Sequence, residues 1–132
     1  MLRTRRLFVL LPLLVLLMAF RQSPLVDPPP IDVPANITVP NVAKAIEISL
    51  IRRGWEPSHK TADGMDGTLH LREHTANIHI SYDAKQVQIR YLNSSNLKYE
   101  ESKGQRLIHS NYLGWIQNLV VDIKANMVLL ES

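Results

Sequence analysis

The sequence predicts an α+β domain in which an antiparallel meander of three to four strands packs against an N-terminal and a C-terminal helix, in the order α-β-β-β-β-α. Three observations support this fold class. Apolar residues recur at helical spacing near position 45 and again near position 115, and they alternate with polar residues in the runs between. The chain of 132 residues has room for one small core and not for two.

The first 20 residues are expected to be a signal peptide or a short signal anchor. Arg3, Arg5 and Arg6 precede an uncharged run from Leu7 to Phe20. As a helix this run would reach about 21 Å, which is short of the roughly 30 Å hydrocarbon core and typical of a signal peptide. The residues before a cleavage point suit signal peptidase poorly, so a membrane tether through residues 1–20 stays open. We expect an exported protein, either periplasmic or anchored in the bacterial cell envelope.

Residues 21–40 are expected to be a proline-rich linker, because this stretch contains six prolines. Proline fixes its own φ and favours extended geometry in the residue before it, so the linker should be a stiff spacer. The remaining residues, 41–132, should then form a single α+β domain.

A first helix is expected from Asn41 to Arg53, where apolar and small residues share one stripe. Pro40 suits its first turn, and Gly54 suits its end. The residues of the stripe are Val42, Ala45, Ile46, Ser49 and Leu50.

Short strands are expected next. A weak strand covers 54–60, turn residues follow at 61–67, and alternating runs cover 68–74, 77–82 and 86–91. Tight hairpins at Thr75-Ala76 and Asp83-Ala84 would join the three alternating runs. In this arrangement His70, His74 and His79 share the wet face, too far apart to hold one metal ion.

The last element is expected to be a helix that begins at about Gln105 or His109 and ends at Ala125. Its apolar residues step by three and four, and Ser102 with Gln105 is a candidate capping box. The stepping residues are Ile108, Tyr112, Trp115, Ile116, Leu119 and Ile123.

Charge and composition exclude several classes of function. The chain has 15 basic and 12 acidic side chains, but four arginines precede the first acid, Asp27, so the rest has 11 basic against 12 acidic. That balance argues against nucleic acid as a partner, because phosphate binding needs clustered cations. The absence of cysteine excludes thiol catalysis and thiolate zinc sites. No metal site and no cofactor are expected.

The C-terminal half resembles a known family. The stretch from Tyr91 to Tyr99, YLNSSNLKY, and the stretch IHSNYLGWIQNLVVDI, residues 108–123, are similar to a family of small exported bacterial proteins, many of them lipoproteins. The shared pattern is Y-x-x-S-x-N-L-x-Y followed by I-H-x-N-Y-x-x-W-I-x-N-L. The resemblance implies an envelope location and a compact α+β body, and it implies no catalytic residues. This chain departs from the lipoprotein members because it has no cysteine for a lipid anchor.

A polar knot, Asn93 to Asn96, is the candidate ligand or structural loop. We expect Asn93, Ser94, Ser95 and Asn96 to bond their own backbone and turn the chain from strand to helix. Aromatic rings should pin this loop, and His109 should hydrogen-bond to it. The rings are those of Tyr91, Tyr99, Tyr112 and Trp115.

The sequence therefore predicts a non-enzymatic envelope domain with a binding or structural role. Two alternatives stay open. One is a small serine hydrolase that uses Ser94 or Ser95 with His109, although no glycine-flanked nucleophile elbow is present. The other is an accessory subunit of an envelope assembly, which would have another envelope protein as its partner.

Overall fold

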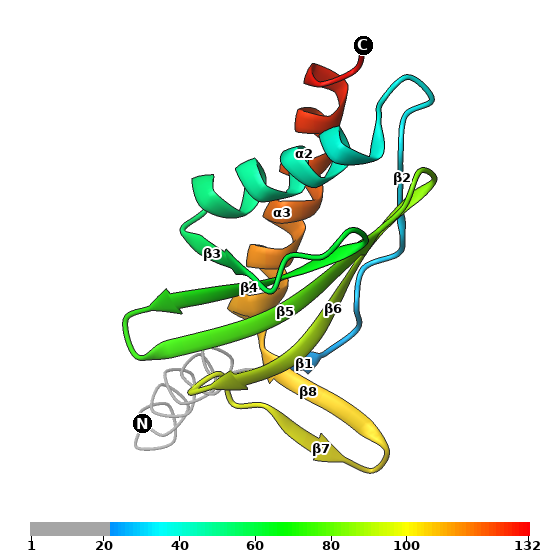
Figure 1. The fold of residues 1–132 in the computed structure, drawn as a ribbon. Coiled ribbons are helices and arrows are strands. Elements are labelled where there is room, and N and C mark those ends of the chain that lie inside the picture. Colours follow the sequence, from blue (N-terminus) through cyan, green and yellow to red (C-terminus); the bar gives the residue numbers. More distant parts are fainter. Residues whose placement is uncertain (1–21) are drawn as a thin grey trace, which may run out of the picture.

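The structure is a computed structural model, and it describes residues 22–132. The expected signal peptide or anchor, residues 1–20, lies outside the described residues. The fold is α+β, with two helices and antiparallel strands that form two sheets (Figure 1). None of the helices in residues 22–132 combines the length and apolarity needed to cross a bilayer.

The larger sheet has five antiparallel strands in the order β2-β6-β5-β4-β3. Its consecutive strands β3 to β6 form the expected meander, and β2 adds to its edge. The strands are β2 (Ile31–Asp32), β3 (Trp55–Ser58), β4 (Gly64–Leu71), β5 (His74–Tyr82) and β6 (Gln86–Ser95). The expected α-β-β-β-β-α order is therefore too simple, because it omits this edge strand and the second sheet.

The second sheet has three strands in the order β1-β8-β7. They are β1 (Gln22–Pro24), β7 (Glu100–Ser102) and β8 (Gln105–His109). The sequence 105–109 was expected to lie in or next to the last helix, and instead it forms a strand that pairs with β1 and β7. The capping box of Ser102 with Gln105 is wrong for the same reason, since these two residues are paired across a hairpin.

Both helices lie on one face of the larger sheet and pack against each other. Helix α2 (Val39–Arg52) begins after Thr38, whose side chain accepts a hydrogen bond from the main-chain N–H of Asn41. It ends before Gly54, which has φ of +84° as a left-handed helix stop requires. Helix α3 (Ser110–Leu129) passes behind the sheet in Figure 1 and crosses α2.

The core between helices and sheet is apolar and tightly closed. The stripe predicted for the first helix is the set of residues that α2 buries. From the sheet, Met65, Ile78, Ile80 and Ile89 are each at most 1% exposed. One polar pair lies inside: Asn126 of α3 donates to the Ser49 hydroxyl of α2.

Residues 22–33, which we call the strap, do not form the expected spacer. The strap runs along the body from β8 to the edge of β6, and its residues Leu25 and Ile31 are only 4% and 2% exposed. Burying two such side chains contributes roughly 3–6 kcal/mol by transfer of apolar surface. The prolines keep the strap extended, but these intervening apolar side chains bind it to the core. Residues 22–33 therefore pack with the body that was expected to begin at residue 41.

The hairpin between β4 and β5 turns at Arg72-Glu73, not at Thr75-Ala76, since Leu71 pairs with His74. This change in register moves His74 to the helix side of the sheet, away from His70 and His79. The β5–β6 hairpin turns where expected, and the Asp83 carboxylate accepts hydrogen bonds from the main-chain N–H groups of Lys85 and Gln86.

Candidate functional site

The polar knot is mostly strand, not turn. Strand β6 continues through Asn93, Ser94 and Ser95 to its end, and Leu92 forms a bulge that has no partner in β5. The chain turns only from Asn96, whose φ of 58° is left-handed. It then enters the β7–β8 hairpin before it reaches helix α3, so the expected strand-to-helix turn is wrong.

Three of the four polar side chains of the knot are hydrogen-bonded within the protein, and the fourth, Ser95, is exposed. Asn93 accepts from the Asn77 amide at 2.7 Å, and the Ser94 hydroxyl lies 2.7 Å from the Tyr91 hydroxyl. The Asn96 side-chain amide donates to the Glu73 carbonyl at 2.8 Å, and the main-chain carbonyl of Asn96 lies 2.6 Å from Nδ1 of His74. These bonds join the end of β6 to the β4–β5 hairpin, which is an architectural role.

Three tyrosines pack together beside the knot. The rings of Tyr91 and Tyr99 stack with centroids 5.0 Å apart, and Tyr112 meets Tyr91 edge to face at 5.6 Å. Trp115, which was expected to join them, lies against His74 instead, with centroids 6.4 Å apart. Aromatic pairs of this kind add about 0.5–1.5 kcal/mol beyond their buried area.

His109 caps helix α3 with its side chain. Its Nδ1 accepts a hydrogen bond from the main-chain N–H of Asn111 at 3.1 Å, and its own N–H donates to the Leu97 carbonyl at 2.7 Å. An Nδ1 that accepts leaves the proton of the neutral ring on Nε2. A hydrolytic triad needs the opposite tautomer, in which Nδ1–H donates to an acid and Nε2 takes the proton of the serine. In the described part of the chain neither Ser94 nor Ser95 hydrogen-bonds to His109.

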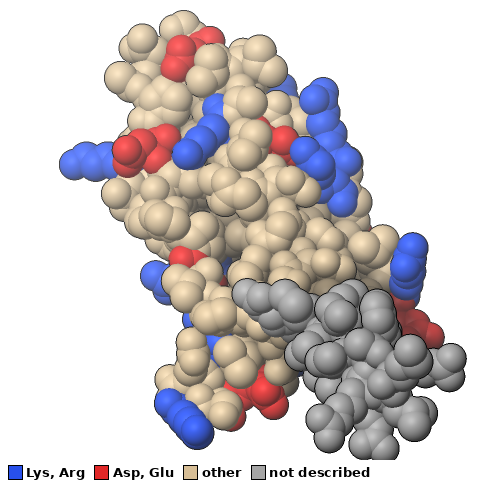
Figure 2. Space-filling model, turned by 180° about the vertical axis from the view of Figure 1, so that it is seen from behind, with Lys and Arg blue, Asp and Glu red and all other residues tan. Residues whose placement is uncertain are grey.

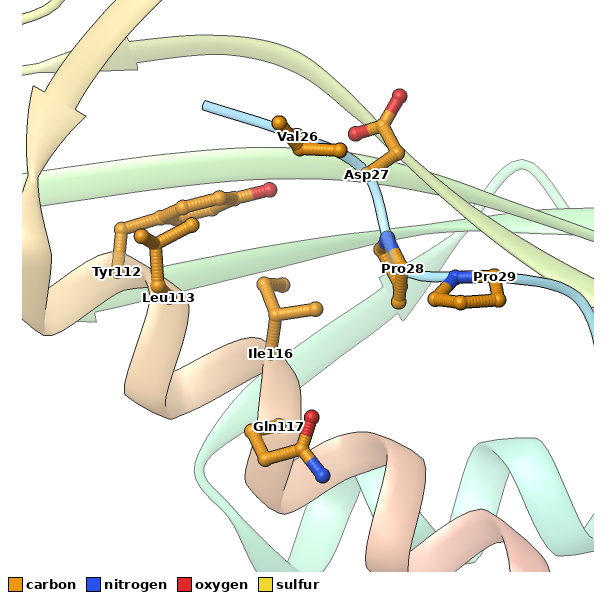
Figure 3. Close-up of a pocket in the computed structure, with 8 residues that line it drawn as sticks. All are labelled: Val26, Asp27, Pro28, Pro29, Tyr112, Leu113, Ile116 and Gln117. Atoms are coloured by element: carbon orange, nitrogen blue, oxygen red, sulfur yellow. The ribbon is translucent and has the colours of Figure 1, made fainter. Parts of the chain in front are cut away.

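A groove between the strap and the first half of α3 contains Tyr112, a candidate residue whose hydroxyl has no partner within the described part of the chain. Figure 3 shows the strap on one side and the helix on the other, with side chains from both directed into the space between. The volume is about 260 Å³. The residues that line it are Val26, Asp27, Pro28, Pro29, Tyr112, Leu113, Ile116 and Gln117.

Tyr112 presents its hydroxyl to this groove. The residue is 2% exposed, yet its hydroxyl has no hydrogen-bond partner, and it points across the groove toward Val26 and Asp27 in Figure 3. Every side-chain nitrogen or oxygen of residues 22–132 that is sealed from solvent has a hydrogen-bond partner. The unpaired Tyr112 hydroxyl is therefore not sealed, and it reaches solvent through the groove. Burial raises the pKa of Tyr112 well above its usual range, and the nearby Asp27 carboxylate raises it further. The hydroxyl therefore stays protonated and is available as a donor.

Side chains, not a strand ladder, hold the strap beside the groove. Asp27 accepts from the main-chain N–H of Tyr91 at 3.0 Å, and Gln88 donates to the Pro28 carbonyl at 3.0 Å. Arg106 lies 3.9 Å from the other carboxylate oxygen of Asp27. The single charge in the groove wall is thus balanced within the protein.

The sequence prediction named Tyr112 but missed the strap wall. Val26 to Pro29 lie in the expected linker, whose six prolines favour an extended spacer. The available signal was the placement of Leu25 and Ile31 on either side of the prolines, since a solvated spacer has no need for large apolar side chains.

The open face of the sheet carries polar side chains. Asp66 accepts from His79 at 2.7 Å and lies 3.1 Å from His59, while Thr68 donates to Asn77. Across residues 22–132 no group of three or more histidine, aspartate or glutamate side chains is arranged to hold a metal ion.

The comparisons with known proteins gave no match to this chain, neither from family models, nor from curated proteins, nor from solved structures. The resemblance drawn from the tyrosine and tryptophan pattern therefore stays a prediction.

Proposed function

We propose that this chain is a non-enzymatic, exported domain of the bacterial cell envelope that acts by binding another envelope component. The observation that carries the proposal is the Tyr112 hydroxyl. It has no hydrogen-bond partner in residues 22–132, although the residue is only 2% exposed, and it faces a largely apolar groove. The hydroxyl reaches solvent through the groove, so a ligand with an acceptor at this point would replace water as its hydrogen-bond partner.

Two groups of the serine hydrolase alternative are paired elsewhere, and Ser95, the other candidate serine, has no hydrogen bond to His109 among residues 22–132. The Ser94 hydroxyl is paired with Tyr91, and the His109 Nδ1 is occupied by a helix N–H. This arrangement supports a non-enzymatic role, since a nucleophile must be within hydrogen-bond reach of its base. A double variant, Ser94→Ala with Ser95→Ala, should complement deletion of the gene as well as the natural chain does. Loss of complementation in a folded double variant would favour the hydrolase.

The envelope location rests on the leader, where arginines precede an apolar run. The mass of the chain isolated from the envelope fraction tests it. A mass reduced by about 19–23 residues indicates a cleaved signal peptide, and the full mass in the membrane fraction indicates an anchor. A full-length chain in the cytoplasmic fraction would contradict the proposal.

The binding role is tested by photo-crosslinking in intact cells. A crosslinking amino acid is placed at Gln117 beside the groove, at Lys103 in the β7–β8 hairpin, and at Arg90 on the open sheet face. An envelope partner gives an adduct of defined mass from at least one of these sites. A chain that yields no adduct from any of the three is not a binding domain, and the proposal fails.

A further inference from the structure

We propose that the groove between the strap and helix α3 binds an extended, uncharged peptide segment of another protein, with one apolar side chain inserted against Leu113 and Ile116. This inference rests on the proposed binding function and names the chemical class of the partner. Three features of the groove lead to it: its donors and acceptors, its size, and its lack of free charge.

The groove offers the hydrogen bonds that a peptide main chain requires. The Tyr112 hydroxyl is a donor suited to a peptide carbonyl. On the strap, the main-chain N–H and C=O of Val26 and the C=O of Pro29 have no partner among the described residues. An extended segment that pairs with Val26 would therefore accept a hydrogen bond from its main-chain N–H and donate one to its C=O, as in the addition of a strand.

The size of the groove favours a side chain over a small molecule. Its volume of about 260 Å³ is below the range of roughly 300–1,000 Å³ found for small-molecule and cofactor sites. Its apolar wall consists of side chains from both elements, and Val26 at its rim is 72% exposed. A groove of this size accommodates one leucine or phenylalanine side chain of a longer segment.

The charge distribution favours an uncharged protein segment over a membrane surface. No charged residue occurs in α3 from Ser110 to Val121. Figure 2 shows this side of the molecule with a broad uncharged area between separate basic and acidic groups. Protein interfaces are depleted of charge at their centre, whereas surfaces that bind anionic lipids concentrate lysine and arginine. Asp27 offers no free charge, because Arg106 and the Tyr91 N–H already face it.

The test uses defined peptides and the chain as isolated from the envelope. The probes are N-acetylated, C-amidated pentapeptides of serine and alanine with a central leucine or phenylalanine, and the matched controls have a central glutamate or lysine. Binding is followed through the amide resonances of Val26, Leu113 and Gln117 in the labelled protein. We expect saturable shifts with the apolar pentapeptides, and at least fivefold weaker binding of the charged ones.

Variants assign the binding to the groove. Tyr112→Phe removes one donor and should weaken the apolar pentapeptides about 3- to 10-fold, as expected for one hydrogen bond. Its matched control is Tyr99→Phe, which removes a hydroxyl outside the groove and should leave binding unchanged. Val26→Glu, at an exposed site that tolerates substitution, should weaken binding at least tenfold. Val121→Glu, which adds the same charge at a site 55% exposed on α3 outside the groove, should not.

The outcomes separate this inference from the proposed function. Equal binding by Tyr112→Phe and by the natural chain, or equal binding of charged and apolar peptides, overturns the groove assignment. Shifts of the same amides by vesicles of phosphatidylethanolamine and phosphatidylglycerol, but not by peptides, would assign the groove to lipid. N-acetyl-leucinamide binding as tightly as the pentapeptides would show that no main-chain contact is made. In each case a crosslinked partner at Lys103 or Arg90 would still support the proposed function.

Discussion

The buried polar pair between the two helices gives the sharpest test of the core. The amide of Asn126 donates to the Ser49 hydroxyl at 2.9 Å, and that hydroxyl donates to the Ala45 carbonyl at 2.7 Å. Ser49 is 0% exposed and Asn126 is 8% exposed. Replacing Ser49 by alanine removes the acceptor and leaves the Asn126 amide buried without its partner.

The expected magnitude follows from that geometry. An unpaired buried amide costs about 1–3 kcal/mol, and the gain in helix propensity from serine to alanine returns roughly 0.5 kcal/mol. The Ser49→Ala variant should therefore lose about 1–2 kcal/mol of the free energy of unfolding. Asn126→Ala should lose a similar amount, because it removes the same bond and some packing. In the double variant both partners are absent, so its loss should be smaller than the sum by about 1 kcal/mol.

Urea unfolding of the three variants and the natural chain measures these free energies, and the midpoint and slope show whether unfolding remains two-state. The reasoning requires a coupling energy clearly above zero. Losses that add to within about 0.3 kcal/mol would show that the two side chains are energetically independent, and the packing assigned to α2 and α3 would then be wrong at this point.

Three further predictions concern glycines and titrating groups. Gly114 is exposed in α3 with open space around it, so Gly114→Ala should raise the free energy of unfolding by about 0.5–1 kcal/mol. A Cβ at Gly67 would lie 3.0 Å from a leucine methyl of α2, so Gly67→Ala should lower that free energy. Urea unfolding measures both changes. The hydrogen bond from Arg53 lowers the pKa of Asp122, so its stabilisation is present above the unfolded pKa and is lost as pH falls; acid titration of Asp122→Asn should lack this loss, and an identical curve would contradict it. Burial raises the pKa of Tyr112, so stability should fall as pH rises above the unfolded pKa of about 10, and Tyr112→Phe should move alkaline unfolding to higher pH; an unchanged midpoint would show that the ring is not buried.

Sequence periodicity was sufficient to predict the elements that bury one face and expose the other. The stripe of the first helix matches the buried residues of α2, and Gly54, which was expected to stop it, has the left-handed φ of a helix stop just after Arg53. The central helix residues Tyr112, Ile116 and Leu119 are buried as the spacing predicts. In these elements the burial of a single face dominates, and that is the property that the pattern of apolar residues records.

The same periodicity could not predict strand register or β-bulges. Moving the β4–β5 turn by a few residues puts His74 on the helix side and leaves His70 and His79 on the open face, since neighbouring side chains of a strand point to opposite faces. The bulge at Leu92 keeps Asn93 paired with Asn77, beyond residue 91 where the alternation of apolar and polar residues ends. Both features depend on pairing between strands, which a pattern within one strand does not encode.

The groove follows from a conflict between the strap and the sheet edge. The outer edge of strand β6 is paired only with the two residues of β2, although the strap lies beside it from Asp27 to Ile31 and a regular strand would pair along that whole length. Pro28, Pro29 and Pro30 have no N–H to donate, so pairing is limited to the two residues of β2. Asp27 and Gln88 then supply with their side chains the acceptor and the donor that the ladder lacks.

The prolines that suggest a spacer in the sequence instead form one side of the groove, which is the consequence for function. A strap paired throughout with β6 would use its main-chain groups in a regular ladder. Held by side chains, the strap leaves the main-chain groups of Val26 and Pro29 without partners among residues 22–132 and faces a helix half that has no charge. The candidate binding surface is therefore set by backbone chemistry in the N-terminal segment, and the polar knot that drew attention in the sequence holds the structure around it.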